Sequence, residues 1–423
     1  MRKLLGVALG LSLLIPSVRS ASRATVFVGA RVVDGGTVIE DAVIVVRDGK
    51  VAAIGSRSKV AIAADAERID VAGKTIIAGM INAHGHVGET VGLKSGAELY
   101  TEENVKRQLA LYARYGITTV VSLGGDQDAA FRLRDAQDKG ALDRARIFPS
   151  GPVLAPATPQ EARKQVAELA ARKPDFVKIR VDDNLGTTPK MSPEIYRAVI
   201  DEAHRQNLRV AAHLYYLDDA KGLLKAGADF VAHSIRDKEV DQELIGLLKA
   251  KDVCVCPTLM REVSTFVYER EPAFFADPFF LRDADKSILD QLRDPKRQEG
   301  VRASKSAQQY KLSLEMAKRN LKRLSDAGVR IAMGTDTGPP GRFQGFFEHE
   351  ELRLMAESGM TPRQILAAAT TDAARCMKAT GRLGTLQPGA WADLVVLGKN
   401  PLDDIANARA IESVWVGGMK IAR

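Results

Sequence analysis

The sequence predicts an α/β fold, a (β/α)8 TIM barrel with a small β domain built from the two ends of the chain. In the middle of the chain, apolar strand-like runs alternate with helix-length segments, a pattern typical of βα units around a parallel sheet. Eight such runs spread over roughly 260 residues, which is the size of an eight-stranded barrel. Short strand patterns with Gly-rich turns occupy both ends.

The end segments alternate apolar and polar residues, as half-buried strands do. The strand-like runs are Val26–Val28, Val43–Val46 and Val51–Ile54 near the start, and Asp393–Leu397 and Val414–Val416 near the end. Arg47–Lys50 and Gly417-Gly418 are expected turns. Because chain termini often lie close together, we predict that residues 23–75 and 385–423 form one domain.

The barrel is predicted over residues 76–384. Its strand-like runs are Thr75–Ala83, Thr118–Leu123, Arg146–Leu154, Phe176–Val181, Arg209–His213, Phe230–His233, Val253–Thr258 and Arg330–Gly334. The expected helices include Glu102–Tyr115, Pro159–Arg172, Pro193–Gln206, Ala220–Ala226 and Leu312–Ala327, several of which end at a glycine. A doubly wound open sheet is the alternative, but no G-x-G-x-x-G motif follows the first run, which disfavours a dinucleotide-binding fold.

A long charged segment, residues 261–310, follows the seventh run. Its aromatic residues include Phe266, Tyr268, Phe274, Phe275, Phe279 and Phe280. The segment is either a lid or substrate wall, or a helical insertion that packs on the barrel rim.

Residues 1–22 have the pattern of a secretory signal peptide. Met1-Arg2-Lys3 is followed by an apolar stretch, Leu4–Ile15, and by small residues around Ser20 and Ser22. The apolar stretch is too short to span a bilayer as a mature anchor. We therefore expect an exported protein, periplasmic or secreted, that is cleaved near residues 20–22 and has no membrane anchor.

The charge pattern and the cysteines argue against a nucleic-acid partner and against a disulfide framework. The formal charge is +8, and loss of Arg2, Lys3 and Arg19 would leave +5. The basic residues are interspersed with acids, so a nucleic-acid partner is not expected. We predict no disulfide framework from Cys254, Cys256 and Cys376, and we interpret the first two as buried strand residues.

His84-Gly85-His86 stands at the end of the first barrel run. Residues i and i+2 of a strand point to the same face, so the two imidazoles can hold one metal ion, with zinc as the first expectation. The alternative is a pair of surface loop histidines.

Other strand ends supply further candidate ligands. Lys178, His213, His233 and Asp336 lie at the ends of the fourth, fifth, sixth and eighth runs. Reactive side chains of such barrels gather at the carboxyl ends of the strands. Each follows an apolar run in which an unpaired polar group would cost roughly 2–7 kcal/mol. We therefore predict that they join His84 and His86.

These residues resemble the amidohydrolase superfamily of metal-dependent hydrolases. The resemblance rests on Ala78–His86, the two histidine strands, Gly334-Thr335-Asp336 and the tail Gly389–Leu394, and it covers nearly the whole mature chain. It is closest to secreted members described as imidazolonepropionase-like or prolidase-like. Those families combine a (β/α)8 barrel with a β-sandwich made from both termini, which implies a β-sandwich here.

The resemblance also implies a ligand set. In binuclear members, a lysine at the end of the fourth strand is carboxylated by CO2 and bridges two metals. Two divalent ions, expected to be zinc, would then be held by His84, His86 and Asp336 and by His213 and His233. N6-carboxylated Lys178 and a hydroxide would bridge them. The alternative is one metal and an unmodified lysine that pairs with a substrate carboxylate.

The implied reaction is hydrolysis of a C–N bond in a small molecule: an amide, a dipeptide such as Xaa-Pro, an N-acyl amino acid or a cyclic amide. The metal-bridging hydroxide would attack, and Asp336 would act as general base and acid. Alternatives are a mononuclear, imidazolonepropionase-like ring opening, and hydrolysis of a lactone or phosphotriester. Tyr216 stands where deaminases tend to carry a glutamate, which disfavours deamination. A non-enzymatic metal- or solute-binding protein is disfavoured by Asp336, because binding needs no proton shuttle.

Substrate contacts are predicted at four residues, Arg180, Tyr215, Tyr216 and His349. Arg180 could clamp a carboxylate or pair with Asp182 or Asp183. The tyrosines and His349 have packing roles as alternatives, and His204 is expected to be structural. Relatives are often oligomers, so a homo-oligomer is possible.

Overall fold

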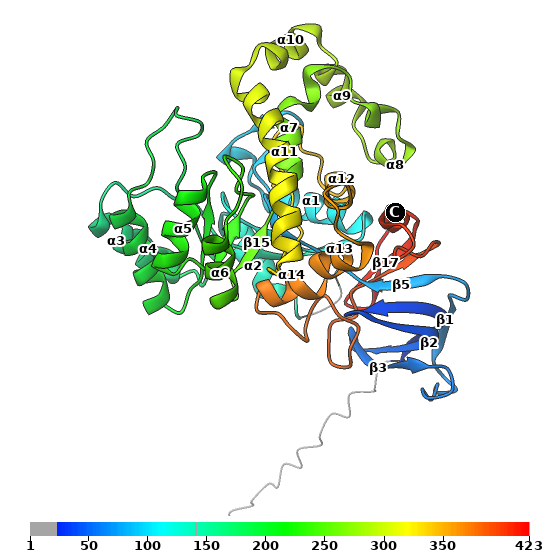
Figure 1. The fold of residues 1–423 in the computed structure, drawn as a ribbon. Helices are drawn as coiled ribbons and strands as arrows, with labels where there is room; N and C mark the ends of the chain where they lie inside the picture. The colour runs from blue at the N-terminus through cyan, green and yellow to red at the C-terminus, as the bar shows by residue number, and fades with distance from the viewer. Residues whose placement is uncertain (1–22, 140–141, 423) are drawn as a thin grey trace, which may run out of the picture.

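The computed structural model describes residues 23–139 and 142–422 (Figure 1). The predicted signal peptide, residues 1–22, lies outside the described residues. Within the described part, no helix has the length and apolar character needed to cross a membrane.

One mixed sheet joins the two ends of the chain. Its eight strands are β1 (Thr25–Asp34), β2 (Thr37–Arg47), β3 (Lys50–Ser56), β4 (Glu67–Asp70), β5 (Thr75–Ala78), β16 (Leu394–Leu397), β17 (Ile411–Val416) and β18 (Met419–Lys420). Strand β5 pairs parallel to β1 on one side and antiparallel to β16 on the other. In Figure 1 the blue N-terminal strands and the red C-terminal segment accordingly lie side by side.

The first predicted run serves two sheets. It divides at Gly79 into β5 and β6 (Met80–Gly85), and β6 pairs parallel to β9 (Ile117–Ser122). A Cβ atom on Gly79 would lie 2.1 Å from Oγ1 of Thr118, so only glycine fits at this crossing point. The strand that carries the histidines is thereby joined directly to the terminal sheet.

Parallel strands make up the middle of the chain. They are β6, β9, β10 (Arg146–Pro149), β11 (Val153–Leu154), β12 (Val177–Arg180), β13 (Val210–His213), β14 (Phe230–Ala232) and β15 (Cys254–Cys256). They pair in the orders β10-β9-β6 and β11-β12-β13-β14-β15. The third predicted run therefore bridges the two groups, since β10 pairs with β9 and β11 with β12. A short hairpin, β7 (Thr90–Val91) and β8 (Lys94–Ser95), follows β6.

The eighth predicted strand, Arg330–Gly334, is not a regular strand. Single parallel bridges join Ile331 to Val255 and Thr337 to Gly85. Backbone hydrogen bonds run from Ala332 N to Val255 O (3.0 Å) and from Ala83 N to Met333 O (2.8 Å). No continuous ladder forms between these contacts, and just after the segment Asp336 adopts the left-handed conformation, with φ of 60°. The segment nevertheless links β15 to β6.

Helices cover the parallel strands. They are α1 (Glu102–Arg114), α2 (Asp128–Ala136), α3 (Pro159–Ala170), α4 (Pro193–Arg205), α5 (Leu217–Ala226), α6 (Gln242–Ala250), α7 (Leu259–Phe266), α8 (Pro278–Leu281), α9 (Lys286–Leu292), α10 (Pro295–Ala303), α11 (Lys305–Asp326), α12 (Phe346–Glu357), α13 (Pro362–Ala369) and α14 (Thr371–Cys376), with 3-10 turns η1 (Ala97–Leu99), η2 (Val267–Glu269), η3 (Ala273–Ala276) and η4 (Ile405–Arg409). Thr101 and Thr158 cap α1 and α3 by accepting backbone N–H bonds. The predicted glycine stop after α5 is confirmed, because Gly227 has φ of 106°.

The 261–310 insertion is helical and packs against α12. The rings of Phe274 and Phe280 lie 5.3 and 4.8 Å from that of Phe346. Figure 1 shows α9 and α10 at the outer end of this insertion. Its phenylalanines thus bury one another on the rim, which agrees with the packing interpretation.

We predicted no disulfide framework, and for one pair of cysteines this prediction is wrong. Cys254 of β15 and Cys376 of α14 form a disulfide with a Cα–Cα distance of 5.9 Å. They are 122 residues apart in sequence, so spacing alone gave no sign that the fold brings them together. Cys256 is a buried free thiol.

Candidate metal centre

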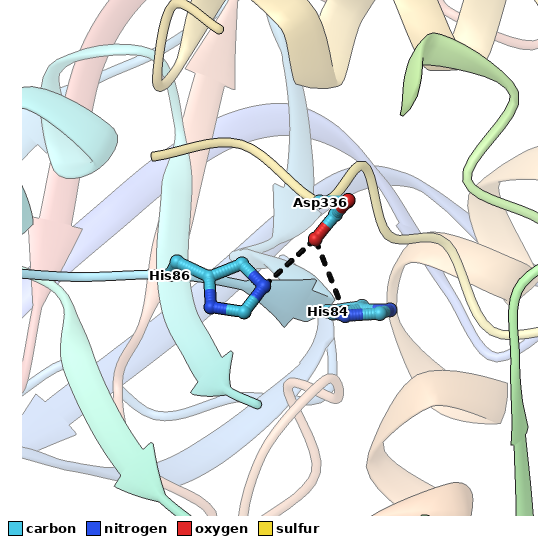
Figure 2. A group of neighbouring side chains, drawn as sticks. All are labelled: His84, His86 and Asp336. Carbon is cyan, nitrogen blue, oxygen red and sulfur yellow. Dashed lines mark hydrogen bonds and ion pairs between the residues drawn. The ribbon is translucent and has the colours of Figure 1, made fainter. Parts of the chain in front are cut away.

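His84, His86 and Asp336 form one group of possible metal ligands (Figure 2). Nε2 of His86 lies 2.7 Å from Oδ1 of Asp336, and Nε2 of His84 lies 3.5 Å from the same oxygen. One possible ligand atom from each residue falls within 4.8 Å of the others. His84 lies near the end of β6 and His86 follows this strand directly, and Asp336 comes from the neighbouring segment that hydrogen-bonds to it.

The other predicted ligands lie against this group. Nζ of Lys178, on β12, is 3.0 Å from Nε2 of His84. The ring of His233 lies 4.6 Å from that of His84 and 4.2 Å from that of His213. The structure therefore brings all six predicted ligands together at one end of the parallel strands. This is expected for side chains at the carboxyl ends of such strands.

Burial keeps three imidazoles of this cluster neutral. It is the largest cause that lowers the pKa of His213 to about 3 and the pKa values of His84 and His233 well below their usual range. Burial also lowers the pKa of Lys178 to about 8. Neutral imidazole is the form that binds a metal, and a neutral amine is the form that reacts with CO2.

Two of the histidines hydrogen-bond to the protein through one ring nitrogen, and a third makes an ion-pair contact. Nδ1 of His86 lies 3.1 Å from the carbonyl of Gly124, and Nδ1 of His233 lies 2.7 Å from Oγ1 of Thr258. Nε2 of His213 lies 2.9 Å from Oδ2 of Asp182. Histidines that bind metals are typically fixed in this way through the second nitrogen.

The remaining nitrogen of His233 tests whether the cluster fits a metal. Its Nε2 is buried and has no hydrogen-bond partner within residues 23–139 and 142–422. A buried unpaired nitrogen is costly, and a divalent ion among these imidazoles would satisfy it. The donor set of imidazoles with one carboxylate is therefore suited to zinc or a similar divalent ion.

Arg342 holds the carboxylate of Asp336. Its Nη1 hydrogen-bonds to Oδ2 of Asp336 and, at 3.1 Å, to the backbone carbonyl of the same residue. Burial opposes ionisation of Asp336, but Arg342 and His86 outweigh it and keep the pKa of this carboxyl well below its usual range. Sequence reasoning missed Arg342, because nothing in the pattern of its loop indicates this contact.

A buried polar network lies beneath the cluster. Glu348 of α12 accepts hydrogen bonds at 2.6 Å from Thr335 and Thr337, and at 2.7 Å from the side-chain amide of Asn82. Asn82 in turn accepts the backbone N–H of His84 at 3.0 Å. Both segments that carry the first ligand group are thus tied to one carboxylate. The sequence signal that was missed is an asparagine inside an apolar strand.

The predicted substrate-binding residues have other partners in this structure. Arg180 pairs with Asp182 at 3.1 Å, as the alternative interpretation stated. The hydroxyl of Tyr215 lies 2.5 Å from Oγ of Ser313. The hydroxyl of Tyr216 donates to Asp183 at 2.8 Å, and burial raises its pKa.

The two remaining histidines lie in helices. Nε2 of His349 donates to the carbonyl of Tyr115 at 2.8 Å, and its ring packs 4.9 Å from that of Phe279. This buried position between α1 and the insertion is a packing role rather than the predicted substrate contact. His204 lies 2.9 Å from Asp229.

Comparisons with known proteins agree with this geometry. The family model for the amidohydrolase family matches residues 75–421. Ochratoxinase of Aspergillus niger is 27% identical over 290 residues, covering 65% of this chain and 52% of that protein, so the match spans about half the length of this relative. Imidazolonepropionase of Streptomyces avermitilis is 25% identical over 373 residues, covering 85% of this chain and 81% of that protein.

Solved structures extend the likeness to the whole fold. A putative prolidase from Bifidobacterium longum superposes with a TM-score of 0.75 at 25% identity, covering 96% of both chains. A Xaa-Pro dipeptidase with bound methionine gives a TM-score of 0.76 at 21% identity, covering 95% of this chain and 100% of that one. With the family match over residues 75–421, these findings show that the chain belongs to the amidohydrolase family.

Proposed function

We propose that the protein is a metal-dependent hydrolase that cleaves a C–N bond of a small molecule with two divalent ions, zinc being the first expectation. The observation that carries this proposal is the convergence of four imidazoles, Lys178 and Asp336 at one end of the parallel strands. Such a cluster is expensive to bury unless something binds to it.

We further propose that the middle region is a closed (β/α)8 barrel, spanning residues 76–384. The pairings of β6 through β15, and the hydrogen bonds of residues 331–337 to both β15 and β6, support closure. The end segments, residues 23–75 and 385–423, form the second domain of the proposal, which in the related families is a β-sandwich.

The residues that would hold the metals fall into two sets. His84, His86 and Asp336 would bind one ion, and His213 and His233 would bind the other, with N6-carboxylated Lys178 between them. When bound, divalent ions lower the pKa of water from 15.7 toward about 7 and polarise the substrate carbonyl.

Asp336 is the proposed proton carrier. Because Arg342 keeps its carboxylate ionised, Asp336 can take a proton from the attacking water. The same carboxyl can then deliver that proton to the leaving amine. Its position 2.7 Å from Nε2 of His86 supports this role, because the attack is proposed at the first group of ligands.

Amides are the proposed substrates, among them dipeptides such as Xaa-Pro, N-acyl amino acids and cyclic amides. Two of the similar proteins are described as a prolidase and a Xaa-Pro dipeptidase, and another as ochratoxinase. The match to imidazolonepropionase favours a second candidate, a mononuclear hydrolase that opens a heterocycle. The two differ in the role of Lys178, which the mononuclear mechanism does not need.

Export is part of the proposal. The signal-like residues 1–22 support a periplasmic or secreted location. The Cys254–Cys376 disulfide supports it independently, because such bonds persist in oxidising compartments.

Metal analysis of the purified protein tests the proposal. We expect about two equivalents of metal in the wild type and at most one in Lys178→Ala, because the bridging ligand is lost. The exposed Lys164→Ala is the control and should match the wild type. One equivalent in all three proteins would exclude the two-metal mechanism. Screening the metal-loaded enzyme with dipeptides, N-acyl amino acids and lactones tests the reaction, and absence of turnover would favour a binding protein.

A further inference from the structure

Two buried arginines lie beside the metal centre and take no part in the mechanism above. Arg236 follows His233 by three residues, and Arg261 follows Thr258, the partner of His233, by three residues. Arg236 is 1% exposed and Arg261 is 7% exposed. Both therefore sit at the end of the strands where the ligands gather.

The two guanidinium groups share one carboxylate. Nε of Arg236 lies 3.0 Å from Oε1 of Glu262, and Nη1 of Arg261 lies 3.1 Å from Oε2 of Glu262. Two positive charges and one negative charge leave this triad with a net charge of about +1. A buried charge without a partner is strongly unfavourable, so the triad is suited to binding one further negative charge.

Arg236 also has an unused donor. Its Nη1 donates to the carbonyls of Leu214 and Ser234, at 3.0 and 2.6 Å. Its Nη2 and its Nε are both buried and make no hydrogen bond in the part of the chain that the structure describes, so Nε contacts Glu262 only as an ion pair. An oxyanion beside this nitrogen would satisfy it.

Tyrosine rings fix the guanidinium planes. Arg261 lies 4.1 Å from the ring centroid of Tyr310 and donates to its hydroxyl at 3.2 Å. Arg236 lies 4.7 Å from the ring centroid of Tyr215. Arginines stacked in this way are already oriented, so little conformational entropy is lost when an anion binds.

The two arginines lie next to the metal centre. Thr258, three residues before Arg261, lies 2.7 Å from Nδ1 of His233, and Nη1 of Arg236 donates to the carbonyls of Leu214 and Ser234, the residues that directly follow His213 and His233. A group held by the two guanidinium groups would therefore lie close to the reacting bond.

We propose that Arg261 and Arg236 form a subsite that binds a carboxylate of the substrate next to the metal centre. This inference rests on the proposed hydrolase function and narrows its substrates to amides that carry a carboxylate. A planar carboxylate matches the fork of a guanidinium and supplies the acceptor that Arg236 lacks.

A pair of substrates tests the subsite. Alanyl-proline and alanyl-prolinamide contain the same scissile bond and differ in the carboxylate. We expect the wild-type enzyme to prefer the acid on the order of 10- to 100-fold in kcat/KM, mainly through KM. Arg261→Gln should bring this ratio close to one, and Arg261→Lys should retain part of the preference. Arg270→Gln, at an exposed position of the same insertion, should behave as the wild type.

Ligand binding provides a test that does not depend on turnover. Benzoate should raise the Tm of the metal-loaded wild type more than benzamide does, and the difference should be lost in Arg261→Gln at unchanged metal content. Tyr310→Phe, which removes only the hydroxyl, should weaken benzoate binding and covers the case in which Arg261→Gln does not fold.

The outcomes separate the two proposals. An unchanged benzoate effect in both variants, or a wild type that does not distinguish benzoate from benzamide, would overturn the subsite. Loss of the benzoate effect in the variants, with no amide cleaved by the wild type, would support the subsite and reject the hydrolase.

Discussion

The side-chain amide of Asn82 donates a hydrogen bond to the carboxylate of Glu348, 2.7 Å away, in the interior of the protein. Because Asn82 also accepts the backbone N–H of His84, the contact sets the position of the histidine strand relative to α12. The same carboxylate holds Thr335 and Thr337, on either side of Asp336. Glu348 thus fixes the spacing between two of the segments that carry the ligands.

Glu348→Ala should weaken metal binding by roughly 10- to 100-fold, because the ligands lose their common support. It should also lower the free energy of unfolding by about 2 kcal/mol, since several buried donors lose their acceptor. Glu348→Gln keeps one acceptor oxygen and should recover part of the metal affinity and part of the free energy of unfolding. Competition with a chelator and urea denaturation measure the two effects. The exposed Glu168→Ala is the control, and wild-type metal affinity in Glu348→Ala would show that the network is dispensable.

Asp182→Asn should weaken the metal site at His213. The carboxylate of Asp182 lies 2.9 Å from Nε2 of His213 and is itself almost fully buried. Loss of its charge lowers the basicity of the ring, and such changes typically cost about 10- to 100-fold in metal affinity. Metal content after dialysis should fall from two equivalents toward one. Asp183→Asn, which removes the charge of the acceptor of Tyr216, serves as the matched control; equal metal loss in both variants would argue against this role.

His349 should make the protein less stable in acid. Burial is the largest cause that lowers its pKa to about 3, whereas the unfolded chain has a value of about 6.5. Between these values the unfolded state binds more protons, so stability falls as the pH drops below about 6.5. From pH 7 to pH 5 this group should remove about 2 kcal/mol.

His349→Gln isolates that contribution. Its unfolding free energy, measured in urea, should fall by about 2 kcal/mol less than that of the wild type between pH 7 and pH 5. The variant should remain active at pH 7, because His349 contacts Tyr115 and Phe279. A large rise in KM would instead support the predicted contact between His349 and the substrate.

Loss of the Cys254–Cys376 disulfide should destabilise the fold. The bond closes a loop between positions 122 residues apart, for which the chain-entropy estimate is about 3–5 kcal/mol. Cys376→Ser should therefore melt well below the wild type and should not respond to a reductant. Cys256→Ala retains the disulfide and should still respond. A thiol assay of the unfolded, unreduced wild type should find one thiol, and three would contradict the bond.

The ligands could be predicted because each is a polar residue at the end of an apolar run. Parallel strands bring their carboxyl ends together, so His84, His213 and His233 needed no other information to be placed near one another. Residues that support them were not predictable in this way. Arg342 lies in a loop and Glu348 in a helix, and their contacts with the centre exist only once the chain has folded.

Local chemistry also explains which parts of the fold were predicted. The end of α5 is determined by Gly227, whose backbone conformation is costly for other residues. Residues 330–334 lie between β15 and β6 as predicted, but they join these strands only through single bridges and hydrogen bonds, and an apolar pattern does not show how many of its residues pair with their neighbours. The disulfide was missed because it depends on two segments that meet only in the folded protein.

Strand β5 has one neighbour from the start of the chain, β1, and one from near its end, β16. Synthesis on the ribosome delivers β1 and β5 long before β16, so β5 keeps an open edge until residue 397 has emerged. Because β5 continues into β6 through Gly79 alone, this open edge leads directly into the histidine strand. The order of synthesis therefore leaves β5 without one neighbour until almost the whole chain has been made, and chains released early would present an unpaired strand that is prone to aggregation.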